Sequence, residues 1–585
     1  MNNSSLSPEN LASQRHSLAH LLAAAVLDIY PDAKRTIGPA VDNGFYYDFE
    51  FMKPLSEGDL TAIENKMREI LPTWSTFERK EVSAAEARTV FADNPYKLEL
   101  IDEFSRDGQS LTLYTSGKYI DLCRGGHVEN ASEIDPQSFK LDRLAGAYWR
   151  GDEKNKMLTR IYGLAFASKA ELDAYLVQRE EAEKRDHKKL GRELQLFTFS
   201  PLVGSGLPLY MPKGNLVRET ILKYITGLKV DHGYSFVWTP HLAKEALYVQ
   251  SGHLGKYDAM LPPIETEEGE RFVMKPMNCP HHFQIYKATP HSYRNLPFRI
   301  AENATDYRNE KSGELNGLLR VRSLTQDDTH HLVRHDQIAS EIDMILEITK
   351  QVYETFGFVD FRCQISTRDP KHKDKYFGTD ELWSVAEQAL VAAVERWGAP
   401  HFIGEGDAAF YGPKIDIMVR DALGREWQLT TVQLDYVQPE NFDMTYVAED
   451  GTDARPAVLH VAILGSLDRF MAIVIEQYGG AFPLWLAPEQ VRILPVSDKF
   501  AEYGGKVLTA LKEAGLRVEM PEASETLGKR IREAEGMKIP CILVVGEKEA
   551  AAQTVTLRER GSADQISLPL AELVQQLSEK SRLRK

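Results

Sequence analysis

The feature that most restricts the fold is a highly charged run at residues 169–194, KAELDAYLVQREEAEKRDHKKLGREL. It pairs opposite charges four residues apart and carries little apolar surface, which is typical of a helix that crosses solvent between separately folded parts. The length of 585 residues also exceeds what one core supports. We therefore expect several domains, with a linker helix over residues 168–196.

Composition, the N-terminal sequence and the cysteines indicate the cellular compartment. The chain is 43% hydrophobic and 27% charged, without an apolar run near the roughly 18 residues of a membrane span. The start, MNNSSLSPENLASQRH, shows neither a secretory signal nor an Arg-rich amphipathic pattern. The scattered cysteines at 123, 279, 363 and 541 cannot form a disulfide framework. We expect a cytoplasmic protein with reduced thiols and no membrane partner.

Local patterns predict an α+β unit at the N-terminal end. Residues 1–12 are polar and rich in Ser, Asn and Pro, which indicates a disordered leader. The next segment, 13–30, spaces its apolar residues for one helical face, and Pro31 ends it. Short strands and turns then follow to about Ala167.

The rest of the chain changes pattern near residue 490. Residues 197–488 are rich in strands without βαβ alternation, which favours an antiparallel sheet flanked by helices. They contain neither GxGxxG nor GxxxxGK[ST], so bound ATP would be held by side chains. The remainder alternates strands and helices, with elements expected at 491–496, 500–515, 517–520, 527–537 and 541–546. This predicts a small α/β domain with a parallel or mixed sheet.

The net charge of −16 is unusual for a protein that binds nucleic acid, because Lys and Arg neutralise phosphates. The excess is unevenly distributed: residues 491–585 are slightly basic and end in KSRLRK, while the remainder is acidic. We interpret the acidic total as a limit on non-specific binding.

Two sets of Cys and His residues are candidate metal ligands. His16 and His20 are spaced i, i+4, and Cys123 and His127 repeat that spacing, which is typical of zinc motifs and also of core histidines on a helix. Three single residues, Cys279, His330 and His460, lack a CxxC, and such residues taken alone are more often packed in a core. Spacing leaves both alternatives open.

Longer phrases resemble class II aminoacyl-tRNA synthetases. RIAENATDYRNEKSGELNGLLRVRSLTQDD, at 299–328, resembles motif 2, and LGSLDRFMAIVIEQYGG, at 464–480, resembles motif 3. AFYGPKIDIMV at 409–419 and WQLTTVQLDY at 427–436 resemble the core of the threonyl-tRNA synthetase family. The resemblance extends from about Ser13 to the C-terminus. From the resemblance we expect the chain to begin at the editing domain, without the ubiquitin-like module that bacterial members often carry before it.

The resemblance implies an α+β multidomain enzyme with a class II antiparallel catalytic core. Its activity would be ATP-dependent ligation of L-threonine to tRNA(Thr) through a threonyl-adenylate, with hydrolytic editing of seryl-tRNA(Thr). The segment LVRETILKYITGLKVDHGYSFVWTP, ending at Pro240, resembles motif 1 and implies a homodimer. The implied divisions are a leader 1–12, an editing domain 13–167, a linker helix 168–196, a catalytic domain 197–489 and an anticodon-binding domain 490–585.

Amino-acid activation brings a carboxylate to the α-phosphate of ATP, so fixed cations must offset the repulsion. The resemblance implies that the planar fork of Arg308 bridges the two groups. It assigns the γ-phosphate to Arg320 and Arg469, the adenine amino group to Glu310, and a nucleotide contact to Gln428. Mg²⁺ is expected with ATP, because metal ions neutralise charge on the phosphates. The sequence does not identify its ligands.

The resemblance also implies one Zn²⁺ per subunit in the catalytic domain, held by Cys279, His330 and His460. Three protein ligands leave positions open for the amino group and β-hydroxyl of threonine. Valine lacks the hydroxyl, and a plain pocket separates such near-isosteres by only about a hundredfold. The threonine-binding residues that the resemblance adds are Met277, Gln326, Asp328, Tyr411, Gln433 and Ser466.

Serine carries a hydroxyl as well, so a second, hydrolytic site is required. The resemblance implies an editing pocket without a required metal, in which a His or Lys activates water. The structural alternative is that the two histidines pack in the core from one helix. The implied editing residues are His16, His20, Lys97, Asp121, Cys123 and His127.

Remaining assignments concern tRNA. His253 in SGHLGKY stands where the family carries a histidine that removes a proton from the terminal ribose, and a structural hydrogen bond is the alternative. Glu549 and Arg558 match anticodon contacts, and Ser524 replaces a frequent Asn. Rival interpretations are a serine or proline synthetase, and a binding-only paralogue that lacks catalysis.

Overall fold

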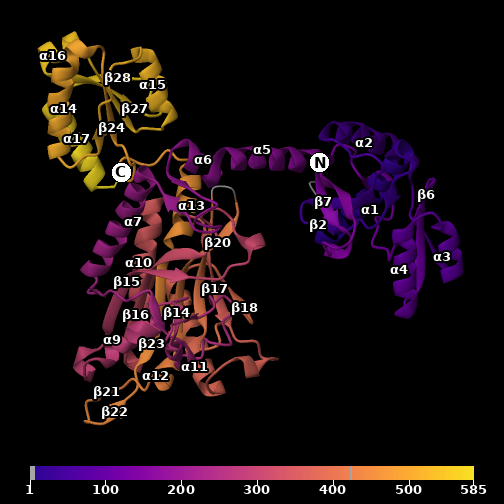
Figure 1. Cartoon of the computed structure of the whole chain (residues 1–585), viewed down its shortest axis with the longest axis horizontal. Helices are drawn as coiled ribbons and strands as arrows, with labels where there is room; N and C mark the ends of the chain where they lie inside the picture. Colours follow the sequence, from indigo (N-terminus) through magenta and orange to yellow (C-terminus); the bar gives the residue numbers. More distant parts are fainter. Residues whose placement is uncertain (1–6, 422–423, 585) are drawn as a thin grey trace. The chain divides into compact units, whose positions relative to one another are not determined.

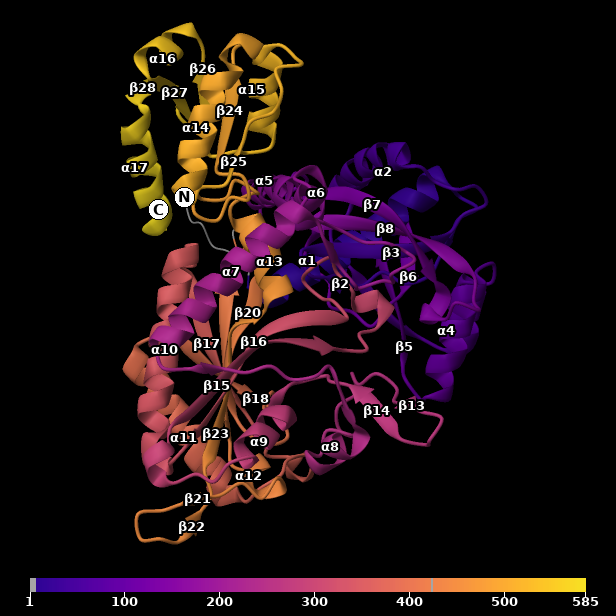
Figure 2. The same ribbon diagram turned by 60° about the vertical axis from the view of Figure 1, so that its left-hand side comes forward.

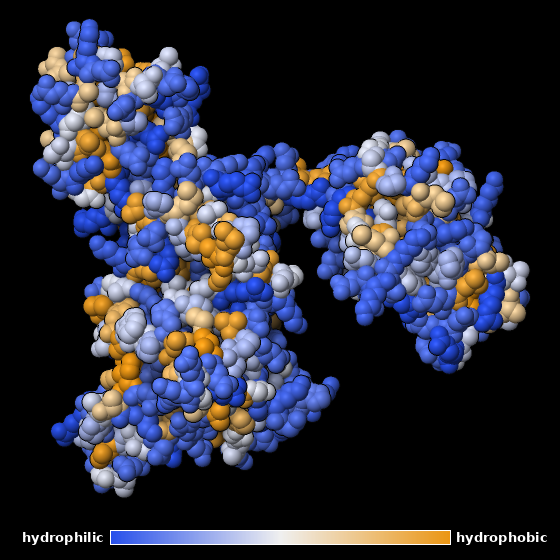
Figure 3. Space-filling model, viewed as in Figure 1, coloured by the Kyte–Doolittle hydropathy of each residue, from blue (hydrophilic) through white to orange (hydrophobic). Residues whose placement is uncertain are grey.

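The computed structural model describes residues 7–421 and 424–584 (Figure 1). It divides into two compact units, Met1–Glu180 and Glu181–Lys585, which are described separately. Within the described ranges, every helix is too short or too polar to traverse a lipid bilayer. The face drawn in Figure 3 is mostly hydrophilic, with apolar side chains in small groups.

The first helix, α1 (Pro8–Ile29), begins earlier than the sequence pattern predicts. The Ser7 hydroxyl accepts a hydrogen bond from the Asn10 amide at 3.2 Å, and proline occupies the first helical position, both typical of a helix N-terminus. The predicted disordered leader is therefore wrong for residues 8–12, and residues 1–6 lie outside the described ranges. The predicted helix end before Pro31 is confirmed.

The first unit has the predicted α+β character. One sheet runs in the order β1-β3-β8-β7 with β2 paired to β3, and a second runs β4-β5-β6. The elements are β1 Lys34–Arg35, β2 Ala40–Val41, β3 Gly44–Glu50, α2 Glu57–Ile70, β4 Glu78–Val82, α3 Ala84–Val90, α4 Pro95–Arg106, β5 Leu111–Ser116, β6 Tyr119–Leu122, β7 Phe139–Tyr148 and β8 Met157–Ala165. The apolar face of α1 packs into the core that the first sheet and α2 share.

The charged run forms two helices, α5 (Lys169–Arg185) and α6 (His187–Glu193), where one was predicted. Leu172 is the buried residue of α5, so a largely solvated helix is confirmed there. The prediction is wrong for α6, because Leu190 and Leu194 belong to the core of the second unit. Asp186 separates the helices, and its carboxylate accepts hydrogen bonds from the backbone amides of Lys188 and Lys189 in the first turn of α6.

The main sheet of the second unit confirms the predicted antiparallel core (Figure 2). The elements are β9 Phe197–Thr198, β10 Leu209–Tyr210, α7 Pro212–Asp231, β11 Ser235–Phe236, β12 Leu242–Lys244, α8 Glu245–Gln250, β13 Ile264–Glu265, β14 Arg271–Met274, α9 Cys279–Lys287, β15 Phe298–Tyr307, β16 Ser323–Val333, α10 Ile338–Phe356, β17 Phe361–Thr367, α11 Asp380–Trp397, β18 His401–Glu405, β19 Lys414–Arg420, β20 Glu426–Asp435, α12 Gln438–Asn441, β21 Tyr446–Val447, β22 Asp453–Ala454, β23 Ala457–Ser466 and α13 Leu467–Gln477. The sheet order is β11-β15-β16-β23-β20-β19-β17-β18, and only its two outermost pairs are parallel among the described strands.

Side-chain alternation gives this sheet a core face and a site face. Helices α7, α10, α11 and α13 share the main apolar core with the sheet. On β16, β23 and β20 the register pairs His330 with His460 and His460 with Gln433. Because neighbouring strands place paired residues on the same face, these three polar side chains form a row across the sheet.

The predicted strand and helix order after residue 490 is confirmed. The elements are β24 Val491–Pro495, α14 Ala501–Glu513, β25 Val518–Glu519, α15 Leu527–Gly536, β26 Cys541–Val545, α16 Glu547–Ala552, β27 Thr554–Glu559, β28 Gln565–Pro569 and α17 Leu570–Arg582. The sheet order is β25-β24-β26-β27-β28, in which β24 pairs parallel with β25 and β26, and the other pairs are antiparallel. Of the two alternatives that the sequence left open, the sheet is mixed.

Candidate functional site

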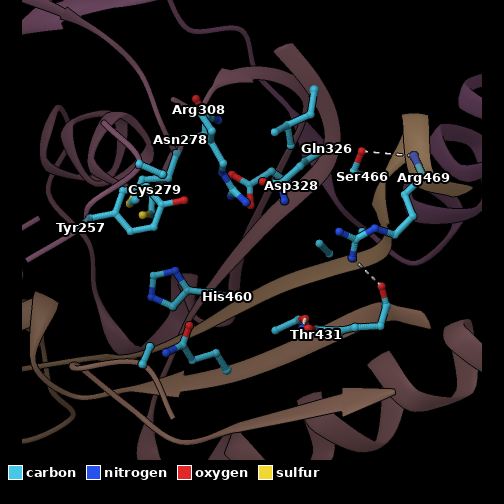
Figure 4. Close-up of a pocket in the computed structure, with 18 of the residues that line it drawn as sticks. Tyr257, Asn278, Cys279, Arg308, Gln326, Asp328, Thr431, His460, Ser466 and Arg469 are labelled. Carbon is cyan, nitrogen blue, oxygen red and sulfur yellow. Dashed lines mark hydrogen bonds between the residues drawn. The ribbon is translucent and has the colours of Figure 1, made fainter. Parts of the chain in front are cut away.

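A cavity of about 890 Å³ lies over the site face of the main sheet. Strands β16, β20 and β23 supply much of its lining, together with the start of α9, the start of α13 and the segment 253–259. Figure 4 shows side chains from these elements turned toward one space. The volume falls within the range usual for pockets that enclose small ligands.

The three single residues singled out in the sequence meet at this cavity. Nε2 of His330 lies 3.0 Å from Nδ1 of His460, and the ligand atoms of both residues and the Cys279 thiol all lie within 4.8 Å of one another. All three residues are buried. The structure thus brings together a thiol and two imidazoles from α9, β16 and β23, which is a donor set that suits zinc.

Each imidazole is held from behind by a second polar group. Nε2 of His460 lies 2.9 Å from the Asp435 carboxylate, and Nδ1 of His330 lies 2.8 Å from Nδ1 of His282. Burial, together with the neighbouring imidazoles, lowers the pKa of His330 well below its usual range, and burial raises the pKa of Cys279 well above its own. Imidazoles that are fixed by outer partners are usual among metal-binding histidines.

Three arginines line the same cavity at positions 308, 320 and 469. Arg308 donates to the Pro276 carbonyl at 3.3 Å, and Arg469 donates to the carbonyls of Leu319 and Gln428 at 3.1 and 3.2 Å. Burial, followed by the charges of the other two arginines, lowers the pKa of Arg469. Three guanidinium groups this close create a positive field that suits a polyanionic ligand.

Glu310 and Gln428 also line the cavity, as the resemblance implies. The Glu310 carboxylate accepts a hydrogen bond from Nε of Arg320 at 2.7 Å, so this acid fixes the orientation of one arginine. Gln428 donates to the Asp416 carboxylate at 2.5 Å and to the Thr431 hydroxyl at 2.9 Å. Both residues are therefore placed by specific contacts.

The predicted threonine-binding residues all line the cavity: Met277, Gln326, Asp328, Tyr411, Gln433 and Ser466. Oδ2 of Asp328 is buried without a hydrogen-bond partner in the described part of the chain, although it lies 3.7 Å from Nδ1 of His330, and burial raises the pKa of this carboxyl. Gln433 donates to the Gly412 carbonyl at 3.1 Å, and the Ser466 hydroxyl caps α13 by accepting from the Arg469 amide at 3.4 Å. The unpartnered Asp328 oxygen is available to a ligand that carries a donor.

His253 is buried at the edge of the cavity. Its Nδ1 lies 2.7 Å from the Ser251 hydroxyl, whereas Nε2 lacks a partner among the described residues. Burial lowers the pKa of His253 to about 4, so the ring is neutral at pH 7. The structural hydrogen bond uses Nδ1, and Nε2 has no hydrogen-bond partner within the described ranges, so the two roles considered for His253 are compatible.

Sequence reasoning missed a buried polar network beneath α9. Nζ of Lys275 donates to the hydroxyl of Thr239 at 2.9 Å and to Oδ1 of Asn278 at 2.8 Å, and Asn278 donates to Glu302 at 2.8 Å. Asn278 directly precedes Cys279, so the network fixes the thiol at the helix start. Lys275 and Asn278 in MKPMNCPHH are the polar residues near Cys279 from which this network could have been predicted.

A second cavity of about 720 Å³ lies in the first unit and is lined by His16, His20, Lys97, Asp121 and Cys123. His127 joins the cluster, because the Cys123 thiol lies 3.5 Å from Nε2 of His16 and 3.4 Å from Nε2 of His127. Burial lowers the pKa of His20 to about 3 and that of His127 to about 2. The sequence therefore identified one cluster of neutral imidazoles and a thiol.

Lys97 and Asp121 form a buried ion pair beside this cluster, with Nζ 2.7 Å from Oδ1. Oδ2 of Asp121 accepts hydrogen bonds from the hydroxyls of Tyr47 at 2.5 Å and Tyr119 at 2.8 Å. Sequence reasoning named Lys97 and Asp121 as editing residues, but it did not predict that they pair, and it missed both tyrosines. YYDF and KYID are strand-like segments, and tyrosine in a strand gives no sign of a polar partner.

The predicted anticodon residues lie on separate elements of the C-terminal α/β region. Ser524 precedes α15, Glu549 lies in α16, and Arg558 lies on β27. Glu549 accepts from the Gly546 amide at 2.9 Å and the Thr556 hydroxyl at 2.7 Å. These contacts fix the carboxylate of Glu549 at the start of α16.

Comparisons with known families agree with this architecture. Residues 263–478 match the tRNA synthetase class II core domain (G, H, P, S and T), and residues 490–580 match the anticodon binding domain. Residues 111–162 match the second additional domain of threonyl and alanyl tRNA synthetases. The fold and its cavity therefore define a class II tRNA synthetase.

Curated relatives show which family within this class the chain belongs to. Threonine–tRNA ligase from Rubrobacter xylanophilus is 50% identical over 557 residues, which cover 95% of this chain and 86% of the relative. The enzyme from Gloeobacter violaceus is 50% identical over 583 residues, which cover 98% and 93%. The chain belongs to the threonine–tRNA ligase family.

Solved structures show the same fold. A crystal structure described as the RNA binding domain of threonyl-tRNA synthetase from Cryptosporidium parvum aligns with a TM-score of 0.65 at 38% identity, covering 67% of this chain and 98% of that one. Prolyl-tRNA synthetase from Giardia lamblia aligns with a TM-score of 0.54 at 16% identity, covering 70% and 80%. The second likeness concerns the fold alone. The 50% identity to curated threonine–tRNA ligases disfavours the rival assignment to a serine or proline enzyme.

Proposed function

We propose that this threonine–tRNA ligase selects its amino acid with one zinc ion held by Cys279, His330 and His460. The observation that carries the proposal is the convergence of one thiol and two imidazoles, within 4.8 Å, at a cavity that three arginines also line. The outer partners of both imidazoles support it, because zinc-bound histidines regularly donate their second nitrogen to such groups. Three protein ligands would leave positions on a bound zinc open for the amino group and β-hydroxyl of threonine, and valine could not supply the second donor.

The side chains around the ion would orient threonine. The unpartnered oxygen of Asp328 accepts a hydrogen bond from the substrate ammonium or hydroxyl. Polar groups of the remaining pocket residues offer further contacts, and the Met277 side chain limits the space for the substrate methyl group. These proposed threonine contacts are Met277, Gln326, Asp328, Tyr411, Gln433 and Ser466.

Activation would follow from the arginine set. A threonine carboxylate oxygen attacks the α-phosphorus of ATP, which is bound with Mg²⁺, and pyrophosphate leaves. Arg308 spans the carboxylate and α-phosphate with its two parallel donors, which offsets the repulsion between the anions. Arg320 and Arg469 hold the γ-phosphate, while Glu310 and Gln428 contact the nucleoside part. The positive field of the cavity supports this assignment.

Transfer to tRNA would use His253. Its neutral ring has an unpartnered Nε2, so this nitrogen can accept the proton that the terminal ribose hydroxyl loses as it attacks the adenylate carbonyl. The Ser251 hydroxyl donates to the Tyr248 carbonyl at 3.2 Å, so it accepts from Nδ1 of His253 and leaves Nε2 as the acceptor nitrogen. Glu549, Arg558 and Ser524 are the proposed anticodon contacts of tRNA(Thr).

Amino-acid-dependent pyrophosphate exchange tests the proposal. We expect strong exchange with threonine, weaker exchange with serine and almost none with valine, because only the first two offer a hydroxyl to zinc. A chelator should lower all exchange by more than about a hundredfold, and added Zn²⁺ should restore it. Exchange that is indifferent to the chelator would contradict the zinc assignment. A binding-only paralogue would show no exchange with any amino acid.

We further propose that the cavity of the first unit hydrolyses seryl-tRNA(Thr) without a bound metal. Its proposed residues are His16, His20, Lys97, Asp121, Cys123 and His127. A neutral amine or imidazole in this cluster takes a proton from water, and water cleaves the seryl ester. The match of residues 111–162 to the second additional domain supports this assignment.

Replacing Lys97 with alanine should lower the hydrolysis of preformed seryl-tRNA(Thr) by at least about a hundredfold, as is usual when a general base is removed. Threonine-dependent pyrophosphate exchange, measured on the same preparation, should stay unchanged, because the residues proposed for it lie in the other unit. Undiminished hydrolysis would remove Lys97 from the editing chemistry.

We also propose a homodimer formed through residues 216–240, the segment that resembles motif 1. Leu216 and Val230 of α7 are 44% and 53% exposed, and Trp238 is 73% exposed, which leaves large apolar side chains for a partner to cover.

We also propose a division of the chain into four parts. These are an editing domain 13–167, a linker 168–196, a catalytic domain 197–489 and an anticodon-binding domain 490–585.

A further inference from the structure

Arg35 lies on β1, behind the cavity of the first unit. Its guanidinium group lies 5.2 Å from the ring centre of Phe91 and 5.3 Å from that of Tyr119, and Nη2 donates to the Ile120 carbonyl at 2.9 Å. Nε lies 3.5 Å from Oδ1 of Asp121. The side chain is 15% exposed and is absent from the cavity lining, so its contact with the site passes through Asp121.

Asp121 therefore faces two cations. Nζ of Lys97 lies 2.7 Å from the same Oδ1 that Nε of Arg35 approaches. The Lys97 and Asp121 side chains are 2% and 1% exposed, and neutral tyrosine hydroxyls occupy Oδ2. A buried group of one negative and two positive charges carries an excess positive charge, and burial disfavours such an excess. The charge that this group can release most readily is the proton of the lysine, since arginine stays protonated.

We propose that Arg35 is a positioning residue for hydrolysis: it neutralises Asp121 so that Lys97 can act as the neutral amine that takes a proton from water. This inference rests on the proposed editing function. With Arg35 present, loss of the lysine proton leaves a balanced carboxylate and guanidinium pair. Without Arg35, the same loss would leave a buried carboxylate without a counter-charge, which is strongly unfavourable.

The pKa of Lys97 is lowered overall, in the direction that this role requires. Burial lowers the pKa of Lys97, Asp121 raises it, and Arg35 lowers it again. The other titratable neighbours are Tyr47 on β3, Tyr119 on β6, His20 on α1 and Cys123 after β6. Burial keeps all four neutral at pH 7, because it raises the pKa of both tyrosines and the thiol and lowers that of His20. Asp121 and Arg35 are thus the charges that set the protonation of the amine.

The proposed hydrolysis of the seryl ester needs no co-reactant other than water. The Lys97 nitrogen takes one proton from water as the water oxygen bonds to the seryl carbonyl carbon. The bond between that carbon and the ribose oxygen then breaks, and the ribose oxygen receives the proton from Lys97. Serine and free tRNA leave, and Lys97 returns to the neutral amine.

The pH dependence of seryl-tRNA(Thr) hydrolysis by the full chain tests this inference. Arg35→Gln keeps a donor for the Ile120 carbonyl and removes the charge. We expect the midpoint of its rate profile to move up by at least about one pH unit, which lowers the rate by about tenfold at pH values below both midpoints. The rate should recover at high pH, after the uncatalysed ester hydrolysis is subtracted. Arg35→Lys keeps the charge and should retain the midpoint of the unmodified chain.

Arg160→Met is the matched control. Its guanidinium group also stacks on a tyrosine, 3.7 Å from the ring centre of Tyr46, and pairs with a carboxylate, Asp48, at 2.7 Å. Its carboxylate partner is Asp48 and not Asp121, and neither Arg160 nor Asp48 is among the charges that act on Lys97, so its loss should leave the midpoint in place. If Arg35→Gln does not fold, Arg35→Met replaces it.

The outcomes separate this inference from the function on which it rests. An unmoved midpoint in the charge-removing variant, or a rate lowered equally at every pH, overturns the role of Arg35 alone. Hydrolysis that is absent from the unmodified chain, or that survives in Lys97→Ala, overturns the editing chemistry and this inference with it. A moved midpoint in Arg35→Lys also overturns the inference, because that variant retains the charge.

Discussion

Replacing Cys279 with alanine is expected to remove zinc from the protein and to lower threonine-dependent pyrophosphate exchange by about a thousandfold. The thiol is buried at the start of α9 and converges on the imidazoles of His330 and His460. Two neutral imidazoles alone bind zinc weakly, and the loss of a Lewis acid at the substrate removes several kcal/mol of stabilisation. Tenfold in rate corresponds to about 1.4 kcal/mol, so a thousandfold loss is consistent with that range. Metal analysis and exchange kinetics measure the two effects.

Cys363 provides the matched control. It is a buried cysteine on β17, in the core of the same unit. Cys363→Ala should keep one zinc per subunit and nearly unchanged exchange, and it should lower thermal stability because it leaves a small cavity in the core. If Cys279→Ala retained both zinc and full exchange, the ion would have to be held elsewhere. The alternative set of His282, Asp328 and His330, whose ligand atoms also lie within 4.8 Å, would then be the next candidate.

The cavity residues could be predicted from sequence because they occur in long, distinctive phrases. Arg308 and Arg320 lie within one such phrase, and Arg469 lies within another. What places His330 beside His460 is the pairing of β16 with β23, strands that are distant in the chain. No local periodicity encodes that pairing. The outer partners His282 and Asp435 were missed for the same reason, although His282 lies one helical turn after Cys279.

The fold was predictable where local patterns and burial agree. The alternating strands and helices after residue 490 each have a clear apolar face, and their boundaries follow the pattern closely. The sequence failed at α6, where Leu190 and Leu194 are isolated apolar residues in the charged segment 186–194, and tertiary packing decides their burial. It failed again at residues 8–12, where a capping serine and a proline outweigh a polar composition. Arg35 gave no signal, because its partner belongs to a different sheet.

Replacing Arg308 with glutamine is expected to lower exchange by about a thousandfold while zinc content stays unchanged. Arg308 reaches the cavity from the end of β15 and is held by the Pro276 carbonyl and the Tyr257 ring. Removing one preoriented donor from charge that develops in a transition state costs about 3–4 kcal/mol. Arg308→Lys should recover only part of the rate, because an ammonium group lacks the planar fork that spans two anions. Exchange kinetics and metal analysis provide the measurement.

Arg362→Gln is the control, because Arg362 pairs with Glu426 at 2.6 Å outside the cavity lining and should change exchange by less than about twofold. The ratio of the threonine-dependent to the valine-dependent exchange rate distinguishes the role of Arg308 from that of zinc. Arg308 acts on a carboxylate and phosphate that every amino acid presents during activation, so Arg308→Gln should lower both rates and keep their ratio. Zinc acts on the side-chain hydroxyl, so partial metal loss should lower threonine exchange more than valine exchange. A ratio that changed in Arg308→Gln would mean that this arginine also contributes to side-chain selection.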